Sequence, residues 1–314
     1  MTTPHVLDLR ASPSPMPRIG ADNLFRRGTI TASAGTGRYA VDWRADRVWA
    51  PGDGVQTLTV ILDEPLPADY CFLALHNLGA DDQAATLSVQ RWTGSAWATV
   101  CGPIAPDDGG AIWRSFDAAP ATSWRIVLDS PASATPAIAI LSLGQALELS
   151  QGIQPGWAPP IFAASADVVD STSEDGLLLA RSLHRRPDET RLDLAPLDDA
   201  WMRDHWRPVR ERLIRQPFGL AWSPHAADAG TALAWTDGMP PADTYSHPGY
   251  MRIAWPLRMI ERRNVAASDT VQEAPPEPPP LPVLIASIML DHDIWLGEGE
   301  IADPGYITID DYPT

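Results

Sequence analysis

Lysine is absent from this chain of 314 residues, so all 23 of its basic residues are arginine. Aspartate and glutamate together number 40, which gives a formal net charge of −17 at pH 7. Such an excess of negative charge repels the phosphate backbone of nucleic acid. We therefore expect no nucleic-acid partner.

Cysteine is almost as scarce. Cys71 and Cys101 are too few for a disulfide framework or a four-cysteine zinc site. No run of 18 apolar residues, which a membrane-spanning helix needs, is present. Residues 1–20 also lack the basic segment and apolar core of a secretory signal. These absences predict a soluble protein that is made in the cytoplasm and does not insert into a membrane.

The negative charge is concentrated at the C-terminus, where residues 266–314 contain ten acidic residues and no arginine. A segment of this kind stays solvated or contacts a basic surface. Candidate subunit contacts on it are Asp291, Asp293, Glu298 and Glu300. The same oxygens could ligate a divalent cation, but the spacing of a calcium loop is missing. We therefore expect no metal site and favour a solvated segment or an arginine contact.

The first half of the chain reads as strands. Short apolar or alternating runs, separated by turn signals at about ten-residue spacing, predict an antiparallel jelly-roll β-sandwich over residues 21–150. The clearest runs are residues 57–62, 70–75, 86–92, 123–128 and 137–143.

The second half is predicted to be β-rich with one main helix at residues 198–215, interrupted at Pro208 and ended by Pro217. Residues 250–260 alternate between apolar and other side chains, so one face is buried and the other carries Arg252 and Arg258. We interpret these two arginines as further candidate subunit contacts. The remaining predicted strands are residues 177–183, 190–194, 218–222 and 231–235.

These patterns give a mainly β fold with an extended C-terminal arm. The stretch EAPPEPPPLP at 273–282 is typical of a polyproline spacer. The predicted parts are an N-terminal arm (1–20), the jelly roll (21–150), a linker (151–164), a β-rich domain (165–265), a Pro-rich spacer (266–282) and an acidic strand-forming arm (283–314).

The apolar run YCFLALHNLG ends in His76 and Asn77, which raises the question of a catalytic base. No Gly-x-Ser-x-Gly elbow and no His-Glu-x-x-His spacing accompanies it. A strand that ends in Asn-x-Gly is also an ordinary turn composition. We therefore interpret His76 as structural and expect no catalytic residue and no cofactor.

A loop rich in aromatic residues and arginine at 35–54 is the other candidate site. Exposed aromatics beside arginine can stack on sugar rings or anchor a protein interface. The alternative is that the tryptophans are core residues beneath the loop, and the sequence favours neither. The candidate glycan or protein contacts are Arg38, Tyr39, Trp43, Arg44 and Trp49.

Residues 28–79, with LSVQRWTGSAW and AILSLGQALEL after them, resemble the galactose-binding-like (discoidin-type) jelly rolls of tailed-phage virion proteins. The later stretches LLLARSLHRRPDETRLDL, DDAWMRDHWRPVRERLIRQPFGLAW and TALAWTDG are similar to tail-tube and distal-tail ring domains. The resemblance covers about residues 20–265, and no calcium-ligand or sugar-ligand motif carries over.

The resemblance implies a non-catalytic structural protein of a phage tail tip, a distal tail or minor tail protein located in the virion. Residues 165–265 would form a ring with other copies and with the tail tube and hub. The jelly roll would serve as an adaptor or would contact a host-surface glycan or receptor. The alternative is a free-standing carbohydrate-binding protein. A glycan-cleaving enzyme is disfavoured because no pair of carboxylates stands out.

Overall fold

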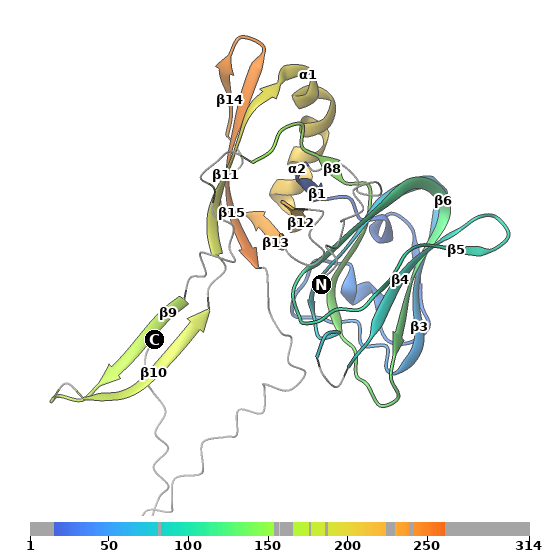
Figure 1. Ribbon diagram of the computed structural model, residues 1–314, viewed down its shortest axis with the longest axis horizontal. Coiled ribbons are helices and arrows are strands. Elements are labelled where there is room, and N and C mark those ends of the chain that lie inside the picture. Colours follow the sequence, from blue (N-terminus) through green and yellow to red (C-terminus); the bar gives the residue numbers. More distant parts are fainter. Residues whose placement is uncertain are drawn as a thin grey trace, which may run out of the picture. The chain divides into compact units, whose positions relative to one another are not determined.

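The computed structural model describes residues 16–80, 83–153, 157, 166–175, 177–185, 188–223, 230–238 and 242–260 (Figure 1). Within these residues the protein is mainly β with one helical segment, which confirms the predicted fold class in its main features. The predicted spacer and acidic arm, including Asp291, Asp293, Glu298 and Glu300, lie outside the described residues.

Among the described residues, six strands of the first half form one sheet in the order β2-β3-β6-β4-β5, with β7 also paired to β3. Their bounds are β2 Thr29–Ala32, β3 Gly54–His76, β4 Thr86–Trp92, β5 Trp97–Ile104, β6 Ile112–Ser130 and β7 Ile138–Gly144. The short helices η2 (Leu24–Arg26) and η3 (Gly37–Ala40) lie between the first of these strands.

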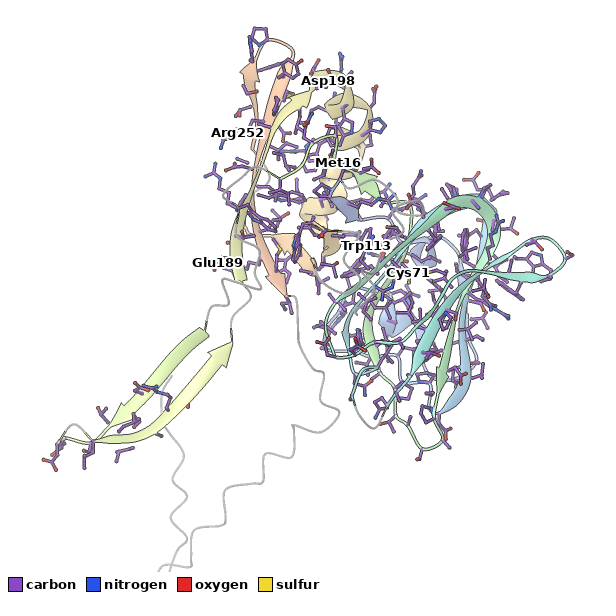
Figure 2. All side chains as sticks on the ribbon, in the orientation of Figure 1. Met16, Cys71, Trp113, Glu189, Asp198 and Arg252 are labelled. Carbon is purple, nitrogen blue, oxygen red and sulfur yellow. The ribbon has the colours of Figure 1, made fainter. Side chains whose placement is uncertain are left out.

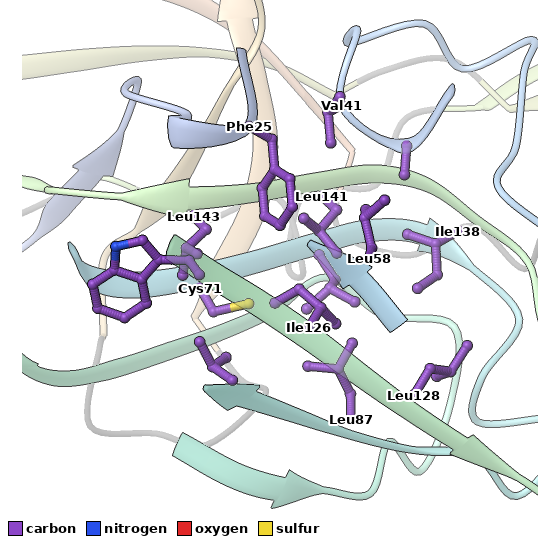
Figure 3. Close-up of a cluster of buried hydrophobic side chains, with 14 of the residues drawn as sticks. Phe25, Val41, Leu58, Cys71, Leu87, Ile126, Leu128, Ile138, Leu141 and Leu143 are labelled. Carbon is purple, nitrogen blue, oxygen red and sulfur yellow. The ribbon is translucent and has the colours of Figure 1, made fainter. Parts of the chain in front are cut away.

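Strands β3 and β6 are long enough to enter both layers of the sandwich. Pairing between them shifts register between Ile61 and Leu66, so each strand has two separately paired halves. The first half of β3 pairs with β2, and the second half pairs with β7. Side chains from both layers then meet in one core, in which Cys71 packs among aliphatic residues (Figure 3).

The second half of β3 and all of β7 are buried without alternation. Cys71 and Leu73 face the sandwich core, whereas Tyr70 and Phe72 belong to a separate apolar cluster with Ala221 of the second sheet. An uninterrupted apolar run is expected when both faces of a strand are covered. This double burial explains why YCFLALH reads as continuous rather than amphipathic.

The second sheet has the order β11-β15-β13-β12-β1-β8, with β14 also paired to β15. Its strands are β1 Arg18–Gly20, β8 Leu147–Glu148, β11 Asp188–Asp198, β12 Phe218–Ala221, β13 Thr231–Thr236, β14 Ala242–His247 and β15 Tyr250–Ile260. The short strands β1 and β8 come from either end of the first half of the chain. The predicted boundaries at residues 20 and 150 stay predictions.

Two glycines let the second sheet approach the aromatic face of the sandwich closely. A Cβ atom on Gly219 would lie 2.6 Å from the Phe72 ring, and one on Gly20 would lie 2.5 Å from the Tyr70 ring. Real side chains do not tolerate such distances, so glycine is required by proximity here and not by backbone torsion.

A buried ion pair joins β1 to β3. Arg18 Nη2 lies 2.7 Å from Asp69 Oδ2, and the two side chains are 7% and 11% exposed. Arg18 Nη1 also donates to Ser115 Oγ, and Asp69 Oδ1 accepts from the Ala146 N–H. Burial raises the pKa of the Asp69 carboxyl, against the opposing effects of the Ala146 N–H and of Arg18.

The predicted helix at 198–215 is present as three consecutive pieces: α1 (Asp199–Trp201), one π-helical stretch η5 (Met202–Trp206) and α2 (Arg207–Arg215). Asp198 caps it, since its Oδ1 accepts from the Ala200 N–H. The π stretch ends two residues before Pro208, whose missing N–H and ring disturb the regular hydrogen-bond ladder. No helix of the described residues is long and apolar enough to span a membrane.

Strands β9 (Ala166–Thr172) and β10 (Leu178–Arg185) form a two-stranded hairpin that pairs with no other described strand (Figure 1). Leu177, Leu178 and Leu179 at its turn are 68%, 56% and 66% exposed. An isolated hairpin is marginally stable in water, and these leucines form an apolar surface to which no other described strand is paired.

Candidate functional site on the outer face of the sandwich

Two tryptophans face each other at the end of the hairpin formed by β4 and β5. Trp92 is paired directly with Trp97 across a four-residue turn. Within that turn the Thr93 N–H donates to the Ala96 carbonyl at 2.9 Å, and Gly94 adopts a φ of 98°. The turn therefore fixes the register that brings the two indoles together.

Strand alternation directs this pair to the outside of the sandwich. Leu87 and Val89 of β4 are buried in the core, while Gln90 and Trp92 are half-buried on the other face. Because successive side chains of a strand point to opposite faces, Gln90 and Trp92 lie on one outward surface.

The two indoles are held with a guanidinium in contact. Their ring centroids are 5.5 Å apart in an edge-to-face arrangement. The guanidinium carbon of Arg125, from the neighbouring strand β6, lies 4.3 Å from the centroid of the Trp97 ring. Both distances fall in the range of favourable aromatic and cation–π contacts. Trp97 is thus covered on one face by Arg125.

Gln90 connects this arginine to the adjacent strand. Arg125 Nε donates to Gln90 Oε1 at 2.7 Å, and Gln90 Nε2 donates to Thr99 Oγ1 at 3.1 Å. Burial lowers the pKa of Arg125, and no charged neighbour is among the causes. We call Trp92, Trp97, Gln90, Thr99 and Arg125 the outer platform.

Strand register continues the platform into a polar row. Thr31 is paired with Thr59, Thr59 with Arg125, Arg125 with Gln90, and Gln90 with Thr99. The row crosses five strands of a rigid sheet, so its side chains are ordered relative to one another without a loop. Such an arrangement offers an aromatic surface flanked by hydrogen-bonding groups.

The structure separates the tryptophans of the predicted 35–54 loop from solvent. Trp49 is fully buried, pairs through its backbone with Ile138 and donates from Nε1 to the Ala34 carbonyl at 2.8 Å. Trp43 is 9% exposed and belongs to the apolar cluster around Tyr70. The predicted ligand contact through Trp49 is therefore corrected: it is a core residue because the loop folds over it.

The polar residues of that loop are engaged locally. Arg44 forms a two-pronged ion pair with Asp46 at 3.0 and 2.7 Å, which raises the pKa of Arg44 and lowers that of Asp46. Tyr39 lies beneath the Arg47 guanidinium at 5.3 Å. Arg38 is exposed. Their role as contacts stays a prediction.

The two arginines of β15 contact carboxylates of their own sheet. Arg252 lies 3.2 Å from Asp193, and Arg258 lies 3.1 Å from Glu189 and 2.9 Å from Asp237. The predicted alternation along this strand is confirmed, since Ile253, Trp255, Leu257 and Met259 are buried. The subunit contact at Arg252 and Arg258 stays a prediction, and it would have to compete with these acids.

His76 and Asn77 close the end of β3. His76 is fully buried, and its Nδ1 accepts from the Leu78 N–H at 3.3 Å. Asn77 Oδ1 accepts from the Ala137 N–H, and its Nδ2 donates to the Thr135 carbonyl. These bonds satisfy backbone groups at the turn, as a structural interpretation requires. In the described part of the chain no three acidic, histidine or cysteine side chains cluster to hold a metal.

The outer platform was missed at the level of sequence, although one signal could have found it. Two tryptophans flank a short turn in WTGSAW, and the preceding TLSVQRW alternates. A direct cross-strand tryptophan pair follows from these two facts together. Arg125 lies on a strand about 30 residues further along the chain, so the local sequence pattern around the two tryptophans does not reveal its contribution. Figure 2 shows all described side chains on the ribbon.

Known proteins give structural likenesses only. No protein-family model matches the chain, and no curated protein does. A chitosan-binding module from a chitosanase/glucanase of Paenibacillus sp. IK-5 is similar at 20% identity, covering 39% of this chain and 98% of that chain, with a TM-score of 0.32. A pectin-binding carbohydrate-binding module is similar at 14% identity, covering 37% and 88%, with a TM-score of 0.32. CBM32-5 of a GH89 protein from Clostridium perfringens, in complex with GalNAc-β-1,3-galactose, is similar at 14% identity, covering 39% and 99%, with a TM-score of 0.34.

Proposed function

We propose that this protein binds carbohydrate without transforming it, through the outer platform of the sandwich. The observation that carries the proposal is the half-buried Trp92–Trp97 pair beside the hydrogen-bonded Arg125–Gln90–Thr99 row. This reading matches the alternative function expected from sequence, but it uses different residues.

The chemistry of a pyranose fits such a surface. One face of the ring presents C–H groups, which pack on an indole, while its hydroxyls need directional hydrogen-bond partners. Trp92 supplies the aromatic surface, because Arg125 covers one face of Trp97. Gln90 and Thr99 supply an amide and a hydroxyl on the same side of the sheet. A rigid sheet also limits the conformational entropy lost on binding.

Isothermal titration of the full chain against neutral and acidic oligosaccharides, chosen from a glycan array, tests the proposal. We expect Trp92→Ala to weaken binding about tenfold, which corresponds to about 1.4 kcal/mol at 25 °C. The matched control is Tyr245→Ala, which removes an aromatic side chain that is 76% exposed on β14 of the second sheet. Equal binding by wild type, Trp92→Ala and Tyr245→Ala would contradict a site on the outer platform.

A second candidate is a structural subunit of a larger assembly, such as the phage tail tip implied by the sequence resemblance, with other copies, a tail tube and a hub as partners. The β9–β10 hairpin favours it, because the hairpin joins no other described strand and exposes three consecutive leucines. Burying such leucines against another copy removes apolar surface from water.

Mass photometry of the full chain at several concentrations distinguishes this second candidate. We expect oligomers that dissociate when Leu177, Leu178 and Leu179 are all replaced by serine. The matched control replaces the exposed Val55 by serine. If the wild type and the triple leucine variant are both monomeric at every concentration, the result counts against self-assembly through the hairpin.

A further inference from the structure

We infer that the outer platform prefers an acidic sugar, a uronate whose carboxylate is bound by Arg125. This inference rests on the proposed carbohydrate-binding function and names the class of sugar. It depends on which donors of Arg125 are already used and on what surrounds them.

The guanidinium of Arg125 is positioned but incompletely satisfied. Its Nε donates to Gln90 Oε1, and its plane contacts the Trp97 ring. Within the described residues, neither of its terminal nitrogens has a hydrogen-bond or ion-pair partner. Those two nitrogens carry four of the five donors of a guanidinium. The two terminal nitrogens of the guanidinium are therefore held in place and available to a hydrogen-bond acceptor from outside the chain.

The electrostatic setting of Arg125 differs from that of the described arginines that form ion pairs. Arg44, Arg181 and Arg258 each contact a carboxylate of the chain. Arg125 contacts an amide and an indole, which leave its positive charge uncompensated. On a chain with a net charge of −17, an uncompensated arginine on a rigid sheet is a local site for an anion.

The planar geometry of the guanidinium favours a carboxylate as the bound anion. Arginine binds planar carboxylates through two parallel hydrogen bonds, and these charge-assisted bonds are stronger than neutral ones. A uronate carries its carboxylate beside a pyranose ring. The ring can therefore pack on Trp92 while the carboxylate meets Arg125, and Gln90 and Thr99 remain for hydroxyl groups.

The experiment is titration of the full chain with oligogalacturonate and oligomannuronate, each compared with its neutral counterpart, oligogalactose or oligomannose. We expect at least one acidic sugar to bind about tenfold more tightly than its neutral counterpart. Arg125→Gln should abolish that preference, because it removes the positive charge that binds the carboxylate. A rise in salt concentration should reduce the preference, since salt screens the ion pair.

The outcomes separate this inference from the proposed function. Equal affinity for acidic and neutral sugars overturns the inference and leaves the proposed function standing. An acidic preference that survives in Arg125→Gln also overturns the inference. If the wild type binds none of the four sugars, the inference and the proposed function are both overturned. If Arg125→Gln unfolds at a lower temperature than wild type, Gln90→Leu replaces it. Gln90→Leu removes the acceptor that orients Arg125, so reduced acidic preference is expected and unchanged preference overturns the inference.

Discussion

The buried Arg18–Asp69 pair gives the sharpest test of how the second sheet is attached to the sandwich. Arg18→Met keeps much of the length and the apolar stem of the side chain. It removes the positive charge that lies 2.7 Å from Asp69 Oδ2. Asp69 would keep the Ala146 N–H, which donates to its Oδ1 at 2.8 Å.

The expected loss follows from burial. Leaving one member of a buried ion pair without its partner costs about 3–5 kcal/mol, and the hydrogen bond that Asp69 keeps places this variant at about 3 kcal/mol. For a protein of this size that corresponds to a fall of about 6–12 °C in the unfolding midpoint. Calorimetry or circular dichroism at pH 7 measures it. A fall of less than about 2 °C would refute the reasoning.

The pair itself is expected to add little net stability. Burial raises the pKa of Asp69 even though Arg18 is in contact, so desolvation outweighs attraction at this site. The double variant Arg18→Met with Asp69→Leu should therefore be at least as stable as wild type and clearly more stable than Arg18→Met alone. The opposite order would show that the ion pair stabilises the fold.

The raised pKa of Asp69 also predicts the direction in which stability changes with pH. The folded state binds a proton at Asp69 more readily than the unfolded state, so this group adds stability at low pH. That contribution is complete below the ordinary aspartate pKa of about 3.9 and is lost as pH rises through the higher folded value. Comparing the pH dependence of unfolding in wild type and Asp69→Asn isolates the effect. The same pH dependence of unfolding in the two proteins would contradict a raised pKa of Asp69.

Three further outcomes are expected. Gly219→Ala should lower the free energy of unfolding by about 1–3 kcal/mol, because its new methyl would meet the Phe72 ring; denaturant titration measures this loss. Gly94→Ala should cost only about 1–2 kcal/mol, since its φ of 98° disfavours alanine but no atom lies within 4 Å. Cys71 should resist alkylation at pH 8 in the native protein and react after unfolding, because burial raises the pKa of its thiol; mass spectrometry follows the reaction.

Local pattern predicted much of the fold. The alternation of residues 250–260 and the strand at residues 86–92 are confirmed, because each depends on a period of two that a single segment contains. The helix at residues 198–215 is confirmed as a helical segment, and its interruption near Pro208 takes the form of a π-helical stretch. Asp198 and Pro208 cap and interrupt the helix through local effects, so the sequence was enough to predict both features.

Features that depend on distant partners were not predicted. The runs at residues 57–62 and 70–75 belong to one strand, β3, which the sequence divided at its prolines. Burial of Trp49 depends on Ile138, almost 90 residues away. The outer platform likewise needs Arg125 from β6 beside the β4–β5 hairpin. Each of these results from long-range pairing, which a local window cannot contain.

The pairing of β1 with β8 has a consequence for how the chain is built. Residues 18–20 and 147–148 are neighbours in the second sheet, and the whole sandwich runs between them. The sandwich is therefore inserted between two adjacent strands of the second sheet, and the chain enters and leaves it through them. A double tether resists swivelling far better than a single linker does. Any ligand held on the sandwich would pull on two antiparallel strands at once, and the load would pass into the second sheet through its backbone hydrogen bonds.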